Sequence, residues 1–93
     1  MTKTELNEKI KESIIKINKQ ISELIIESKT RLGYISFELD VEIESKALTG
    51  TEISLVADSI YRHFREYDNN ACEIDLVYCR ETNKQFITIK YQQ

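Results

Sequence analysis

The sequence predicts an α+β fold of the order α-β-α-β-β, with two helices packed on one face of a three-stranded antiparallel sheet. Three observations lead to this prediction: apolar residues recur every three or four positions near the N-terminus, alternate with polar residues from residue 33, and then repeat both patterns. The 93 residues include no proline and only two glycines, and no linker or internal repeat divides them. We therefore expect residues 1–93 to form a single domain.

The first segment is predicted to be a helix over residues 4–29. Thr2 and Glu5 have the spacing of a capping box. A near-heptad apolar stripe follows, which includes Ile10, Ile14, Ile17, Ile21 and Leu24. The helix would be about 39 Å long, whereas a compact domain of this size is about 32 Å across. We therefore expect the stripe to extend past its own sheet and to form the seam of a homodimer. The alternative is that it packs only in the core.

The middle of the chain is predicted to be a strand followed by a second helix. Over residues 33–44 five apolar side chains alternate with polar ones: Ile35, Phe37, Leu39, Val41 and Ile43. Thr49 and Glu52 repeat the capping-box spacing, and the apolar spacing behind them predicts a helix over residues 50–68.

The last segment is predicted to be a β-hairpin over residues 72–91. A turn at Thr82 and Asn83 would place Asp75 opposite Lys90 on one face and leave the other face wholly apolar. Because a helix connects the first two strands, the third fits between them, and the strand order 1-3-2 makes every neighbouring pair antiparallel. The order 1-2-3, which requires a parallel pair, is the alternative.

Nothing in the sequence indicates catalysis, a cofactor or a metal site. Cys72 and Cys79 would lie about 23 Å apart in one strand, too far for a disulfide. His63 is the only histidine, and no pair of closely spaced cysteines accompanies it, so a structural zinc site is not expected. The chain has no glycine-rich phosphate loop, and no motif places a nucleophile beside His63. We expect a non-enzymatic protein.

The charge and hydropathy of the chain bear on its location and its partners. No stretch approaches the roughly 20 apolar residues of a membrane span, and charged residues interrupt any signal-peptide core near the N-terminus. We expect a cytoplasmic protein without membrane contact. The net charge of −3 and the isoelectric point near 5.2 argue against a general binder of nucleic acid.

The candidate binding surface is a row of acids at alternate positions of the first strand. The row consists of Glu38, Asp40, Glu42 and Glu44, and Glu73 and Asp75 would extend it across neighbouring strands. Strand parity places the four acids of the row on one face, about 6.7 Å apart. Such a row is either a solvated outer face that discourages edge pairing or a contact surface for a basic protein.

The leading functional hypothesis is a non-enzymatic interaction protein that uses this acidic face. Small, acidic, motif-free α+β chains are typical of inhibitors of nucleic-acid-handling host proteins, such as the anti-CRISPR and anti-restriction proteins of phages and mobile elements, and of small immunity proteins. The alternative is a dimeric nucleic-acid-binding or regulatory protein that uses Arg62, His63 and Arg65, or its basic N-terminal helix.

Overall fold

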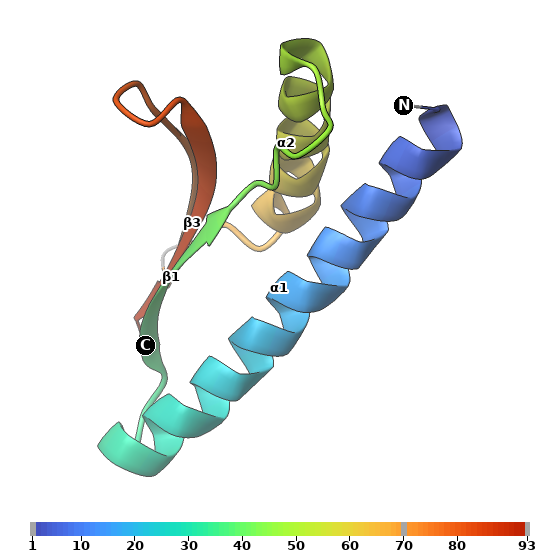
Figure 1. Cartoon of the computed structure of the whole chain (residues 1–93). Helices are drawn as coiled ribbons and strands as arrows, with labels where there is room; N and C mark the ends of the chain where they lie inside the picture. The colour runs from blue at the N-terminus through green and yellow to red at the C-terminus, as the bar shows by residue number, and fades with distance from the viewer. Residues whose placement is uncertain (1, 70, 93) are drawn as a thin grey trace.

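A computed structural model of the chain describes residues 2–69 and 71–92, which form two layers (Figure 1). The elements are α1 (Lys3–Leu32), β1 (Ser36–Glu42), α2 (Gly50–Arg65), β2 (Cys72–Cys79) and β3 (Lys84–Gln92). The three strands form an antiparallel sheet in the order β1-β3-β2. Helix α1 packs against β1, and α2 packs against β2 and β3. The predicted fold class and the preferred strand order are thus confirmed.

Helix α1 is longer than the predicted range of residues 4–29. The Thr2 side chain caps its N-terminus by accepting a hydrogen bond from the N–H of Glu5 at 3.2 Å. At the other end, Gly33 adopts a left-handed conformation with φ of 82°, and its N–H donates to the carbonyl of Lys29 at 2.9 Å. Gly33 therefore ends the helix instead of starting the strand, and β1 begins only at Ser36.

The length of α1 determines the shape of the whole domain. Its 30 residues span about 45 Å, and the molecule measures 44 × 28 × 21 Å. The comparison with a compact domain about 32 Å across was therefore wrong, because the domain is elongated along α1 (Figure 1).

The hydrophobic core lies between the helices and the inner face of the sheet. Its most deeply buried side chains come from all three parts of the fold: Ile17 from α1; Val56, Ala57, Ile60 and Phe64 from α2; and Ile74, Ile87 and Ile89 from the sheet. Their positions follow the helical period in α1 and α2 and the two-residue period in the strands. In the described part of the chain no helix covers the opposite face of the sheet, which carries mostly polar side chains.

The hairpin register differs from the predicted one by two residues. In the structure Asp75 lies opposite Thr88, and Lys90 lies opposite Glu73. The physical reason is the turn: β2 ends at Cys79 and β3 begins at Lys84, so four residues close the hairpin instead of two. Because the shift is an even number of residues, every side chain stays on its predicted face.

Helix α2 begins at the predicted position and ends earlier than predicted. Thr49 and Glu52 form a complete capping box: the Thr49 hydroxyl accepts from the N–H of Glu52 at 3.2 Å, and the Glu52 carboxylate accepts from the N–H of Thr49 at 2.9 Å. The helix ends at Arg65 because the N–H groups of Tyr67 and Asp68 bond to carbonyls three residues back, which closes a tighter turn.

Candidate functional site

The outer face of the sheet, opposite the helices, carries the acidic side chains. Strand β1 contributes Glu38, Asp40 and Glu42, and β2 contributes Glu73 and Asp75. All five side chains are exposed. They lie on the same side because they alternate with the inward-facing residues of each strand. We call these five residues the acidic face.

Strand β3 lies between the two groups of acids and supplies one lysine to their first cross-strand row. Lys90 is opposite Glu38 of β1 and opposite Glu73 of β2. Its Nζ atom lies 3.8 Å from Oε1 of Glu38, with both side chains more than half exposed. An exposed pair of this kind contributes roughly 0.2–1 kcal/mol. Lys90 therefore pairs with one of the two carboxylates that flank it in this row.

The second row contains no basic side chain. Thr88 separates Asp40 of β1 from Asp75 of β2. Neither carboxylate has an ion pair among the described residues, and the same holds for Glu73. This row is consequently the most negative part of the acidic face.

The third row is partly neutralised and partly apolar. Glu42 lies opposite Phe86, which in turn lies opposite Val77 of β2. The Oε1 atom of Glu42 is 3.1 Å from Nζ of Lys84, near the start of β3. The negative charge is therefore concentrated in the first two rows, and most strongly in the second row, on either side of Thr88.

The charge balance of this surface is uneven, but the repulsion within it is modest. Its five carboxylates are accompanied by two ammonium groups on β3. Neighbouring carboxylates of β1 lie about 6.7 Å apart, and in water such a pair repels by about 0.6 kcal/mol before salt screens it. The fold tolerates this repulsion, and the unbalanced charge is available to attract cations from solution.

Glu44 does not belong to the acidic face, although the sequence placed it in the same row. The last β1 backbone bond to β3 runs from the N–H of Ile43 to the carbonyl of Gln85, at 2.8 Å. Beyond it the chain leaves the sheet, and the carboxylate of Glu44 lies 4.0 Å from Nζ of Lys9 on α1. Asp75 of β2, which the sequence indicated as an extension of the row, lies across Thr88 from Asp40.

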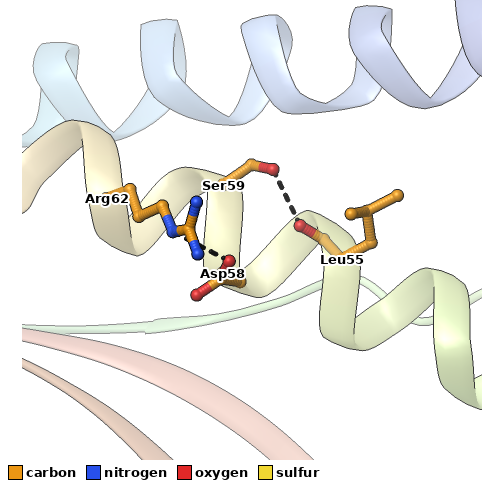
Figure 2. Close-up of polar contacts among 4 residues, drawn as sticks. All are labelled: Leu55, Asp58, Ser59 and Arg62. Carbon is orange, nitrogen blue, oxygen red and sulfur yellow. Dashed lines mark hydrogen bonds and ion pairs between the residues drawn. The ribbon is translucent and has the colours of Figure 1, made fainter.

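The basic residues of the alternative hypothesis lie in the last turn of α2. Arg62, His63 and Arg65 are all exposed. Figure 2 shows the Arg62 guanidinium turned back along the helix toward Asp58, with Nε 3.0 Å from the carboxylate. The His63 ring contacts the edge of Phe64, at a centroid distance of 5.0 Å. The carboxylate beside Arg62 reduces the positive charge that this turn could present to a phosphate.

The apolar stripe of α1 contributes largely to the core of the same chain. Ile17 is fully buried, Ile10, Ile14 and Ile21 pack against the core, and Leu24 is half-buried. Helix α1 as a whole contacts α2 and β1. A homodimer joined along this stripe therefore stays a prediction, although Ile17 is taken up by the core of its own chain.

The two cysteines are free and lie in different environments. Cys72 is buried on the inner face, where burial raises the pKa of its thiol and the nearby carboxylate of Asp68 raises it further. Cys79 is at the end of β2, where hydrogen bonds from the hydroxyl and the N–H of Thr82 lower its pKa. The two thiols should therefore differ in reactivity.

Two further findings concern the described part of the chain. It contains no group of three or more His, Cys, Asp or Glu side chains arranged to hold a metal ion. None of the helices within residues 2–69 and 71–92 has the length and apolar character needed to cross a membrane.

Comparison of the chain with protein-family models, with curated proteins and with solved structures finds no match. The function must therefore be inferred from the surface itself.

Proposed function

We propose that the protein is a non-enzymatic interaction protein whose acidic face binds a basic surface on another protein. One observation carries the proposal: the face of the sheet without helices presents five exposed carboxylates, and Asp40, Glu73 and Asp75 have no ion pair among the described residues. Lysine or arginine side chains of a partner would relieve the repulsion among them. This electrostatic complementarity would chiefly raise the rate of association with the partner and the specificity for it.

Partial mimicry of a phosphate backbone extends the proposal to a partner that itself binds nucleic acid. Along one strand of a duplex, phosphates follow each other at about 3.4 Å of helix axis, so the acids of β1 repeat at about half that density. A protein surface that binds the phosphate backbone would meet a similar, sparser row of anions here. In this proposal the chain occupies that surface and acts as an inhibitor of a nucleic-acid-handling protein.

The test neutralises the β1 part of the acidic face. The triple variant carries Glu38→Gln, Asp40→Asn and Glu42→Gln, all at exposed positions, so the fold should persist. A fluorescent lysine-rich peptide serves as the basic probe, and the basic protein captured from a lysate by the immobilised wild-type chain serves as the second. We expect the association rate of both to fall several-fold. The effect should disappear at high salt, because the Debye length is about 8 Å at physiological ionic strength and only about 3 Å at 1 M.

A control variant separates the acidic face from the overall charge. Three exposed acids of α1, replaced as Glu8→Gln, Glu23→Gln and Glu27→Gln, change the net charge by the same amount at a different place. This control variant should bind both probes with an association rate close to that of the wild-type chain. Equal losses in both triple variants would contradict the proposal, as would an unchanged rate in the variant of the acidic face. Tighter binding of an RNA or DNA oligonucleotide by that variant would favour the nucleic-acid-binding alternative.

A further inference from the structure

The two outer strands of the sheet each have one free edge, and the hydrogen-bond pattern shows which backbone groups line it. The N–H of Gln92 donates to the carbonyl of Ala71 at 2.9 Å, and these two residues are opposite each other in the register of β2 and β3. Antiparallel residues alternate between pairs that bond to each other and pairs that do not. The backbone groups of Ile74, Leu76 and Tyr78 therefore point away from β3, toward the free edge.

The start of the β2 edge is closed by the loop that precedes it. The N–H of Cys72 donates to the backbone carbonyl of Asn69 at 3.2 Å and to its side-chain oxygen at 3.1 Å. In return, the N–H of Asn69 donates to the carbonyl of Cys72 at 2.8 Å. Farther along the strand, the edge-facing N–H and C=O groups of Ile74, Leu76 and Tyr78 have no partner within the described residues.

The two free edges differ in how they are protected. By the same alternation, the edge of β1 is lined by residues 38, 40 and 42, whose charged side chains discourage another strand from pairing there. The second half of β2 has no such protection: Leu76, Val77 and Tyr78 are 38%, 43% and 53% exposed. Figure 1 shows the turn of the hairpin at one end of β3, on the side of the molecule away from α1.

We propose that β2 pairs with β2 of a second copy of the chain, antiparallel and about a two-fold axis centred at Leu76. Leu76 then lies opposite Leu76 of the second copy, and Ile74 lies opposite Tyr78. Each of these pairs bonds through both of its edge-facing groups. Every open N–H and C=O of Ile74, Leu76 and Tyr78 in both chains is thereby satisfied.

The self-complementarity of β2 favours a second copy and selects this register. A pairing centred one residue earlier would place Asp75 opposite Asp75 of the other copy, and like charges directly opposite are destabilising. A pairing centred at Val77 would place Ile74 opposite Arg80, in the hairpin turn. Only the register centred at Leu76 pairs all the open backbone groups, brings apolar side chains together on the inner face, and keeps carboxylates apart.

The pairing goes beyond the proposed function, because it concerns a different surface of the molecule. It would produce a continuous six-stranded sheet in the order β1-β3-β2-β2-β3-β1. A two-fold axis that relates antiparallel neighbours stands perpendicular to the sheet, so both outer faces lie on the same side. Two copies of the acidic face would then be presented together. The dimer can exist or fail to exist independently of what the acidic face binds.

The test measures the mass of the protein in solution by analytical ultracentrifugation. The wild-type chain should sediment at twice its 10.9 kDa. Leu76→Pro removes an N–H that no ladder bond uses, so it should keep the fold and yield a monomer. Leu76→Lys would place two ammonium groups opposite each other and should also yield a monomer. Asp40→Pro, the matched change on the edge of β1, should remain dimeric, and circular dichroism verifies that each variant is folded.

A cysteine variant tests the register itself. In a chain carrying Cys72→Ala and Cys79→Ser, Leu76→Cys should form a disulfide-linked dimer on mild oxidation, because the Cα atoms of a hydrogen-bonded antiparallel pair lie about 5.5 Å apart. Asp75→Cys in the same background should not, because its counterpart lies diagonally, about 8 Å away. A wild-type chain that stays monomeric at every concentration overturns the proposal, whether or not the edge then pairs with a strand of another protein. A folded Leu76→Lys variant that stays dimeric overturns it as well.

Discussion

The position of Ile17 in the core leads to a quantitative prediction about stability. The Ile17 side chain is 0% exposed and belongs to the same buried cluster as the core residues of α2 and the sheet. Ile17→Ala would remove its three outer carbon atoms and leave a cavity that rigid neighbours on three sides cannot fill. Such a substitution at a fully buried site costs about 3–4 kcal/mol, within the usual range of roughly 2–5 kcal/mol.

This loss would be a large part of the total stability of so small a domain. Small domains unfold with a free energy of about 5–15 kcal/mol. At about 4–8 °C per kcal/mol, the melting temperature should fall by roughly 12–32 °C. Urea unfolding followed by far-UV circular dichroism, at two protein concentrations that differ tenfold, measures the change in the free energy of unfolding.

The same substitution two residues away provides the control. Ile15 lies on α1 and is 68% exposed, so Ile15→Ala should change the free energy of unfolding by no more than about 0.5 kcal/mol. Similar losses in the two variants would refute the assignment of Ile17 to the core. So would a difference between the variants that depends on protein concentration, because it would place Ile17 between two copies of the chain.

The other predictions concern the cap of α2 and the thiols. Thr49→Ala removes the N-cap and should lower the free energy of unfolding by about 1 kcal/mol in urea unfolding, whereas Thr49→Ser should not. The hydrogen bond from the N–H of Thr49 lowers the pKa of Glu52, so the stability that this carboxylate adds is complete above the ordinary glutamate pKa and is lost as the pH falls through the lowered one. The stability difference between wild type and Glu52→Gln should therefore shrink in acid, and a pH-independent difference would contradict this. In the folded protein Cys79 should react with iodoacetamide much faster than Cys72 near neutral pH; equal rates by peptide mass spectrometry would disprove the assigned environments.

The helix ends illustrate how far local signals can be read from a sequence. The N-caps at Thr2 and Thr49 follow from a three-residue spacing, and both are present in the structure. Gly33 was visible as a break, but whether it ended a helix or began a strand depended on its left-handed conformation. The end of α2 was misjudged because its last turn tightens through bonds that leave no signal in the apolar pattern.

The acidic face shows where strand parity, the alternation of side chains between the two faces of a strand, predicts their positions correctly and where it does not. Parity placed Glu38, Asp40 and Glu42 together, because the side chains of an extended strand alternate between its faces. It failed at Glu44, since the rule applies only as long as the chain stays in the sheet. The hairpin register failed for a related reason: the sequence allowed two turn lengths of the same parity, and the longer one formed.

The sequence by itself determined the type and order of the elements and the faces that their side chains share, and it favoured the strand order that formed. These properties follow from backbone periods and connection rules that act over short stretches of chain. Only the tertiary structure decided that the stripe of α1 packs into the core, that Glu44 lies outside the acidic face, and that the edge of β2 is open whereas charged side chains line the edge of β1. These outcomes depend on contacts between segments far apart in the sequence, and on which surfaces those contacts leave uncovered.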